Sequence, residues 1–174
     1  MELQFVFLIA FSTLFLPLVY SSIIAAPPVP TKAGDVRRMI GLGEIKPTDT
    51  VYDLGAGDGR LILGAAEFSD SERIIGYELS PVHVLICKIK ILLSGQSDRI
   101  SIRMNNFYTA NLSDADVVFC FLNPFALEKL RPKFESELKK GSRVVSYSFQ
   151  IEGWKATLED RTAENRLPIY VYQR

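Results

Sequence analysis

A short apolar run that leads into three alternating glycines constrains this chain more than any other feature. Residues 51–54 have the pattern of a buried strand, and a helical pattern begins at Arg60. Between them lie Gly55, Gly57 and Gly59. Glycine has no Cβ and tolerates positive φ, so this turn leaves bare main chain against which a nucleoside can lie. A dinucleotide fingerprint needs Gly-x-Gly-x-x-Gly or Ala, and Arg60 occupies its last small position, so the spacing disfavours NAD.

Strand-like and helix-like patterns alternate along the rest of the chain. Strands are predicted over residues 50–54, 73–78, 100–104, 115–122 and 143–149, with a terminal hairpin of 155–158 and 169–173. Helices are predicted from a cap at Thr31 to Gly41 or Gly43, over 60–67, from Pro81 to Gly95, and over 126–140 with a break at Pro132. This alternation predicts an α/β fold with a Rossmann-like, doubly wound, mostly parallel sheet. A chain of 174 residues has room for one such domain, which we place at residues 50–174.

A doubly wound sheet binds its ligand beyond the carboxyl ends of its central strands. The first three strand ends hold the candidate binding residues, which are Asp53, Gly55, Ala56, Gly57, Gly59, Glu78, Leu79, Asn106 and Phe107. The carboxylate of Glu78 can accept hydrogen bonds from both hydroxyls of a ribose. The alternative is that Glu78 only places a negative charge at the start of the following helix.

Composition argues against two other kinds of site. Lysine plus arginine equal aspartate plus glutamate at 20 each, so no overall field would recruit nucleic acid. Cys87 and Cys120 lie in apolar runs without metal-ligand spacing, and we expect buried free thiols and no metal site. His83 receives no role.

The first 26 residues are predicted to form a transmembrane anchor. No residue from Phe5 to Ala26 is charged, and the run is long enough to cross roughly 30 Å of hydrocarbon as a helix. A cleaved secretory signal ending at Ala26 is the alternative, but no lysine or arginine precedes the apolar run.

Residues 27–49 are predicted to be a proline-rich spacer followed by a leading helix. The nearest positive charges, Lys32, Arg37 and Arg38, follow the apolar run. The positive-inside rule then predicts a single-pass membrane protein whose large domain faces the cytoplasm or the matrix.

Several stretches together resemble one family. They are Pro27-Pro28-Val29-Pro30-Thr31, Asp53 to Arg60, Gly76-Tyr77-Glu78-Leu79-Ser80-Pro81, Leu130-Arg131-Pro132-Lys133, Gly141 to Ser146, and Trp154. The chain resembles class I S-adenosylmethionine-dependent methyltransferases, and among them the small membrane-anchored lysine methyltransferases of the mitochondrial adenine nucleotide translocase and the ATP synthase c subunit. The resemblance implies a seven-stranded Rossmann-like fold, S-adenosyl-L-methionine as methyl donor, and lysine side chains of membrane proteins as substrates.

Within that resemblance, individual residues take expected roles. Asn106 is placed to meet the adenine amino group, at a position where these enzymes often have aspartate. Asp53 orients the glycine turn or approaches the amino acid moiety of the cofactor, while Arg60 is interpreted as solvated.

The segment Asn123-Pro124-Phe125 is similar to the Asn/Asp-Pro-Pro-Tyr/Phe motif of amino-methylating enzymes, although its second proline is absent. The motif implies that the amide oxygen and a main-chain carbonyl accept hydrogens of the target amine, while the aromatic ring packs on the target. An ordinary turn from strand to helix is the alternative, because Asn-Pro is common there.

The sequence thus predicts a membrane-anchored N-methyltransferase whose partner is a lysine of a membrane protein. The alternatives are a small-molecule or nucleic-acid methyltransferase and a cofactor-binding membrane module without catalysis.

Overall fold

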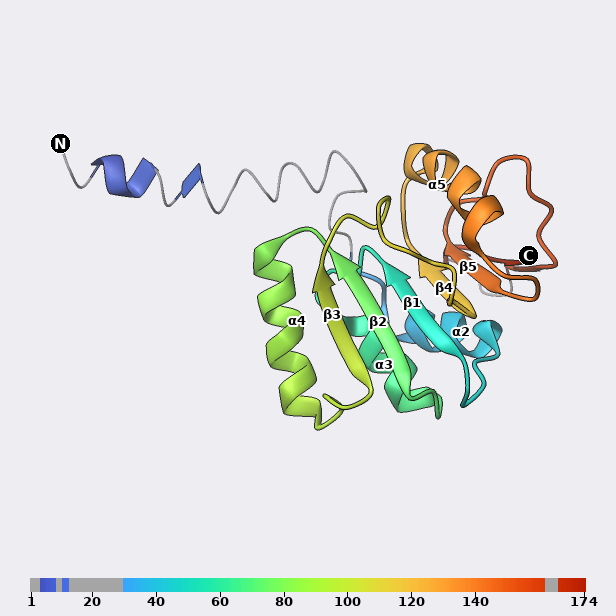
Figure 1. Ribbon diagram of the computed structural model, residues 1–174, viewed down its shortest axis with the longest axis horizontal. Coiled ribbons are helices and arrows are strands. Elements are labelled where there is room, and N and C mark those ends of the chain that lie inside the picture. The colour runs from blue at the N-terminus through green and yellow to red at the C-terminus, as the bar shows by residue number, and fades with distance from the viewer. Residues whose placement is uncertain (1–3, 9–10, 13–29, 162–165) are drawn as a thin grey trace.

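Helices and strands alternate in the computed structural model, which describes residues 4–8, 11–12, 30–161 and 166–174 (Figure 1). The helices are α2 (Ala33–Gly43), α3 (Arg60–Phe68), α4 (Pro81–Ser94) and α5 (Pro124–Glu137). The strands are β1 (Thr50–Leu54), β2 (Arg73–Glu78), β3 (Ile100–Met104), β4 (Val117–Cys120), β5 (Arg143–Tyr147), β6 (Leu158–Asp160) and β7 (Ile169–Gln173). The predicted α/β alternation is therefore confirmed.

The seven strands form one sheet in the order β3-β2-β1-β4-β5-β7-β6. Strands β1 to β5 pair in parallel, whereas β7 runs antiparallel to both β5 and β6. The chain moves outward from β1 to β3 and then returns to place β4 on the other side of β1. That reversal is the topological switch point at which such sheets bind their ligands.

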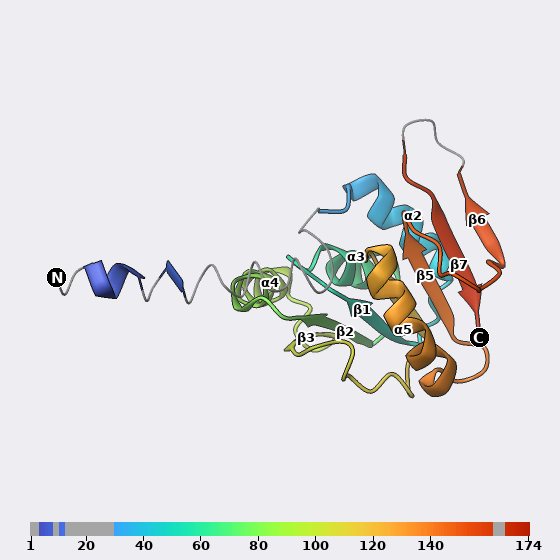
Figure 2. The ribbon, with the colours of Figure 1, turned by 90° about the horizontal axis from the view of Figure 1, so that it is seen from above.

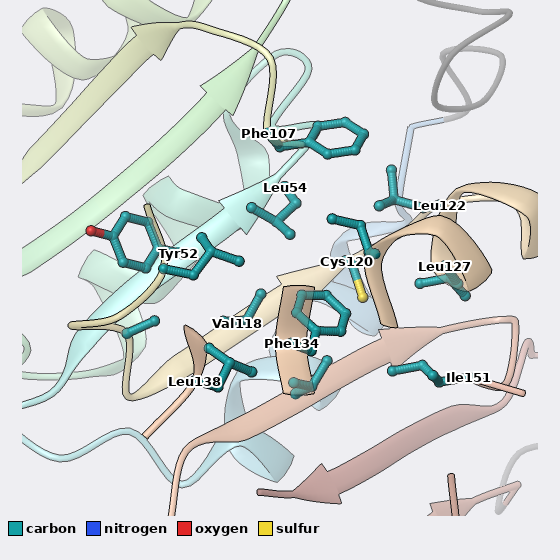
Figure 3. Close-up of a cluster of buried hydrophobic side chains, with 14 of the residues drawn as sticks. Tyr52, Leu54, Phe107, Val118, Cys120, Leu122, Leu127, Phe134, Leu138 and Ile151 are labelled. Atoms are coloured by element: carbon teal, nitrogen blue, oxygen red, sulfur yellow. The ribbon is translucent and has the colours of Figure 1, made fainter. Parts of the chain in front are cut away.

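Both faces of the sheet are covered. Successive side chains of a strand point to opposite faces, and successive residues of the central strands are mostly apolar, so each face needs a covering layer. One face packs against α2, α3 and α4 through a core that includes Val51, Ile74 and Val117. Their neighbours along the strands point to the opposite core, beneath α5 and the segment after β3. Figure 3 shows Phe134 of α5 over this second core, and Figure 2 shows the layers from above.

Some element boundaries differ from those predicted. Strand β4 is only Val117–Cys120, because Ala115 lies in a turn whose N–H bonds to the carbonyl of Leu112 at 3.1 Å. Strand β5 ends at Tyr147, since Ser148 adopts a left-handed φ of 75°. Strand β6 begins at Leu158, later than the predicted 155–158, but its antiparallel pairing with β7 confirms the terminal hairpin.

Two helix predictions were wrong. Pro132 does not break α5, which continues to Glu137 with the exposed proline on its outer side and buried Leu130 and Phe134 holding the inner side. Thr31 does not cap α2: Lys32 occupies the N-cap without a side-chain hydrogen bond, and Thr31 is buried with its carbonyl bonded to Arg60.

The expected anchor lies mostly outside the described residues, which omit residues 9–10 and 13–29. Among those that are described, no helix combines the length and apolar character needed to cross a membrane. The anchor therefore stays a prediction.

Gly59 is a place where the fold has no room for a side chain. A Cβ there would lie 2.3 Å from Cys87 Sγ, and the residue has a φ of 80°. We expect Gly59→Ala to lower the free energy of unfolding by about 3 kcal/mol, from overpacking plus left-handed strain. Gly95 also has a positive φ, but a Cβ there would meet only open space. Gly95→Ala should therefore lower the free energy of unfolding by only about 1 kcal/mol. Urea unfolding measures both.

A double-mutant cycle separates the effect of the contact with Cys87 Sγ from the effect of the left-handed backbone at Gly59. In a Cys87→Ala background the Sγ atom is gone, so Gly59→Ala should cost markedly less than in the wild type. Equal costs in the two backgrounds would show that the contact with Cys87 does not limit this position.

Candidate active site

The glycine turn leaves β1 with three left-handed residues. Gly55, Gly57 and Gly59 have φ values of 84°, 54° and 80°, which a side chain would disfavour. The N–H groups of Gly55 and Ala56 both donate to the carbonyl of Tyr77 at 2.9 Å, and that of Gly59 donates to Ala56 at 2.9 Å. The turn is therefore held to the end of β2 by main-chain hydrogen bonds.

The glycines face different surroundings. Gly59 lies against Cys87, whereas a Cβ on Gly57 would meet nothing nearer than the carbonyl oxygen of Gly55, at 4.0 Å. The main chain at Gly57 thus borders open space, as expected of a surface that receives a nucleoside. A Cβ on Gly55 would lie 3.3 Å from Leu122, so the turn also adjoins the end of β4.

Glu78 ties the glycine turn to the start of α4. Its Oε2 accepts from the Gly57 N–H at 2.9 Å, and its Oε1 accepts from the Ser80 N–H at 2.8 Å. Glu78 therefore does place its negative charge at the start of α4, which was the structural alternative to a role in binding ribose. A carboxylate has about four lone-pair sites, so acceptor capacity remains for ribose hydroxyls beside Gly57. The next residue, Leu79, is half-buried.

Asp53 is a buried carboxyl group at the end of β1, only 4% exposed. Burial, followed by the negative charges of Glu78 and Asp58, raises the pKa of Asp53 to about 8. Its charged form is thus disfavoured unless a cation approaches. The ammonium group of an amino acid ligand is such a cation. The carboxyl groups of Asp53 and Glu78 therefore fit the expected cofactor, S-adenosyl-L-methionine.

A network of charges holds the other side of the turn. Asp58 accepts from Arg60 Nε and Nη2, both at 2.9 Å, and from Lys90 Nζ of α4 at 2.7 Å. The two cations hold the pKa of Asp58 far below its usual range, with the hydrogen bond from Arg60 as the largest cause. Arg60 Nη1 also donates to the carbonyl of Thr31 at 2.6 Å.

The interpretation of Arg60 as a solvated side chain was therefore wrong. It connects the cofactor turn to the residue that follows the proline-rich segment. The only sequence signal for this was the pair Asp58 and Arg60, two residues apart, and nothing near them points to Thr31 or Lys90.

The segment after β3 is held to the end of β2, because the Asn105 N–H donates to the carbonyl of Glu78 at 3.2 Å. Asn106 Oδ1 accepts from the N–H of Tyr108 at 3.0 Å, which shapes a tight turn, and the Asn106 side chain is half-buried. The ring of Phe107 is 2% exposed and packs in the core (Figure 3). Its assignment to the cofactor site stays a prediction. Lys129 Nζ of α5 lies over the Tyr108 ring, 4.3 Å from its centroid.

Asn123, Pro124 and Phe125 form the turn from β4 into α5. Asn123 Oδ1 caps the helix by accepting from the Ala126 N–H at 2.8 Å, and Pro124 takes the first helical position. The Phe125 side chain is 68% exposed. The ordinary strand-to-helix turn is thus what the structure shows, and the amine-positioning role stays a prediction.

Within the described residues, no three histidine, cysteine or acidic side chains are grouped as metal ligands would be. Cys87 and Cys120 are buried thiols, as expected. Burial raises the pKa of Cys120 to about 12, so it is a poor nucleophile.

The sheet order and the open glycine turn define a class I methyltransferase. An RNA methyltransferase from Salinibacter ruber, solved in complex with S-adenosyl-L-homocysteine, superposes with a TM-score of 0.79 at 32% identity, over 83% of this chain and 93% of that one. The C-terminal domain of precorrin-6Y C5,15-methyltransferase from Rhodobacter capsulatus shares the fold, with a TM-score of 0.67 at 18% identity over 88% of this chain and 95% of that one.

Residues 53–158 match the family described as the ANTKMT methyltransferase domain, and the chain belongs to that family. A protein-lysine N-methyltransferase of Saccharolobus islandicus (strain REY15A) is 38% identical over 83% of this chain and 92% of that protein. The adenine nucleotide translocase lysine N-methyltransferase of Mus musculus is 33% identical over 74% of this chain, which spans 56% of the mouse protein. The chain is an S-adenosylmethionine-dependent methyltransferase.

The raised pKa of Asp53 has a consequence for stability. The folded state keeps a proton on Asp53 up to about pH 8, whereas the unfolded chain releases it near about pH 4. Because the folded state binds more protons between these values, the free energy of unfolding falls as the pH rises through them. We therefore expect the wild type to lose stability relative to Asp53→Asn from about pH 4 to about pH 8. Thermal unfolding across this range measures the difference.

Asp58→Asn is the matched control, with the opposite sign. Because the pKa of Asp58 is lowered, the advantage of the wild type over Asp58→Asn should disappear as the pH falls. Parallel stability curves for the wild type and Asp53→Asn would contradict the assignment of a raised pKa to Asp53.

Proposed function

We propose that this chain is a membrane-anchored N-methyltransferase that transfers methyl groups to lysine side chains of a membrane protein. The observation that carries the lysine assignment is the 38% identity to a protein-lysine N-methyltransferase, which extends over 92% of that relative. Two lysine N-methyltransferases of Mus musculus, one named for the adenine nucleotide translocase and one for the ATP synthase c subunit, support the same acceptor.

The donor side of the site fits S-adenosyl-L-methionine, which supplies a methyl group on a sulfonium for attack by an amine lone pair. The bare main chain at Gly57 gives the nucleoside a surface. Glu78 keeps lone pairs for ribose hydroxyls, and the buried Asp53 provides a carboxyl that becomes charged beside an ammonium group.

The acceptor side is assigned to the turn after β4. Asn123 Oδ1 has a second lone pair beyond its hydrogen bond to the Ala126 N–H, so it can accept a hydrogen from an amine. The exposed ring of Phe125 can pack on the alkyl part of a lysine. Orienting the amine lone pair toward the methyl group lowers the barrier by positioning, once the lysine has lost its proton.

The membrane anchor is assigned to residues 1–26, of which residues 5–26 contain no charge. Thr31 is the fifth residue after Ala26, and an extended chain covers that separation with at most about 18 Å. Arg60 bonds to the carbonyl of Thr31, so a membrane anchor that ends at Ala26 would bring the bilayer near the cofactor turn. The positive residues after the anchor favour the cytoplasmic or matrix side for the catalytic domain.

A nucleic-acid methyltransferase is the second candidate. The likeness to the Salinibacter ruber RNA methyltransferase, at 32% identity, favours it. The balance of 20 basic and 20 acidic residues argues against it, because nucleic-acid binding relies on excess positive charge.

A single labelling experiment tests the proposal. Membranes from cells that express the full chain are washed with alkaline carbonate and incubated with donor labelled in its methyl group. We expect the chain to stay in the membrane pellet and the label to appear as methyllysine in a membrane polypeptide. Membranes with Glu78→Ala serve as the control and should incorporate little label, because a hydrogen-bond acceptor for the ribose is lost.

Each readout can overturn one part. Recovery of the chain in the wash would exclude the anchor, and label in RNA or small metabolites instead of protein would exclude lysine as the acceptor.

Asn123→Ser separates the two roles of Asn123. Serine also caps helices, so α5 should keep its stability, but the amide is lost. We expect donor affinity to stay unchanged and methyl transfer to fall by about tenfold or more, as for the loss of one orienting hydrogen bond. Donor titration and single-turnover rates measure the two effects.

The control is Asn111→Ser, because Asn111 Oδ1 also accepts a local main-chain hydrogen bond, from Ser113 at 2.9 Å, but lies in the loop that precedes β4. Wild-type turnover by Asn123→Ser would show that Asn123 only caps the helix.

A further inference from the structure

Helix α4 carries an apolar surface that faces solvent. Its members, named here the α4 stripe, are Leu85 (60% exposed), Ile86 (38%), Ile89 (50%), Leu92 (72%) and Leu93 (80%). At 100° per residue they lie within an arc of about 120° on one side of the helix. The opposite side buries Val84, Cys87 and Ile91. The helix therefore has two apolar faces, of which the fold of the described residues uses only one.

The α4 stripe lies at the edge of the molecule. Figures 1 and 2 show α4 beside β3, at the end of the sheet farthest from β6. Contiguous exposed apolar surface of this kind marks a site of interaction with a protein or a membrane.

The charges of α4 favour an anionic lipid surface. Residues 81–94 contain two lysines and no acidic residue. Lys88 is exposed at one margin of the α4 stripe, and Lys90 lies near the other margin with its Nζ on Asp58. An apolar stripe with flanking lysines is the pattern of a helix that lies in the plane of a bilayer interface.

The route of the chain places α4 near the expected anchor. Thr31 is bonded to Arg60, Arg60 to Asp58, and Asp58 to Lys90 in the middle of α4. The apolar run that ends at Ala26 is only five residues from Thr31. If residues 5–26 cross a bilayer, its surface meets the domain on the side of this network.

The size of the α4 stripe also favours lipid over protein. A standard protein interface engages about 20–30 residues a side, whereas the stripe offers five side chains of one helix. Insertion of a single helix face into the headgroup region needs no larger surface.

We propose that α4 lies in the headgroup region of an anionic bilayer, with the α4 stripe turned toward the lipid. This rests on the proposed membrane anchor and adds a second contact, which fixes the orientation of the domain. Because α4 begins at Pro81, three residues after Glu78, the glycine turn that Glu78 holds would then lie near the bilayer surface, where the lysine of a membrane protein would be presented.

Site-directed spin labels test the proposal in the full chain. Both native cysteines have 0% exposure, so a nitroxide reagent should modify only an introduced cysteine. Leu92→Cys places the label in the α4 stripe. Ser94→Cys is the matched control, since it is exposed on the same helix but about 200° further round. The proteins are reconstituted in vesicles of phosphatidylcholine and phosphatidylglycerol, and flotation first reports whether the chain is membrane-bound.

Compared with the label at position 94, we expect the label at position 92 to be several-fold more accessible to oxygen, which concentrates in hydrocarbon. It should also be several-fold less accessible to a nickel chelate, which stays in water. Vesicles of phosphatidylcholine alone should weaken this difference, because the exposed Lys88 loses its anionic lipid partners.

The remaining outcomes overturn the proposal in distinguishable ways. Floating protein with equal nickel accessibility at the two positions would refute lipid contact while leaving the anchor intact. Protein that fails to float would refute the anchor and the lipid contact together. Protection of position 92 from both reagents that disappears on dilution with lipid would assign the α4 stripe to a second copy of the chain.

Discussion

The close approach of Gly59 to Cys87 is the constraint on which the site depends. With no Cβ between them, the start of α3 can lie directly against α4. That closeness lets Asp58 reach Lys90 across the two helices, while Glu78 reaches the N–H of Gly57 from the other side. The turn is thereby held by α4, by β2 and by the segment before α2. Its outer surface, where Gly55 is exposed and Gly57 is half-buried, remains open to a ligand.

The regular parts of the fold were predictable because they depend on local pattern. The bounds of β1, β2 and β3 agree with the prediction, since each is a short apolar run between clear breaks. The wrong boundaries arose where tertiary contacts override local preference. Pro132 is a helix breaker by propensity, yet the buried residues on either side of it keep α5 continuous. The apolar run of β4 continues past Cys120, but its last residues lead into the cap formed by Asn123.

The site was predictable in outline and not in its connections. Strand topology brings Asp53, Glu78 and the glycine turn together, and a sequence can indicate this once strands and helices alternate. The partners of Arg60 could not be found in the same way, because Thr31 is 29 residues away and contributes a main-chain carbonyl, which every residue possesses. The burial of the Phe107 ring could not be predicted for a similar reason, since its position after β3 does not indicate which way the side chain points.

The place of β7 between β5 and β6 has a consequence for how the domain is made. Strand β6 pairs with β7 alone, and β5 has β7 as its second neighbour. A ribosome makes residues 169–173 after the other six strands of this sheet, so the sheet stays incomplete on one side until then. Until β7 emerges, β5 offers an unpaired edge, the kind of surface on which newly made chains associate wrongly. A nascent chain that already has β5 but not yet β7 therefore carries an edge that the finished sheet covers.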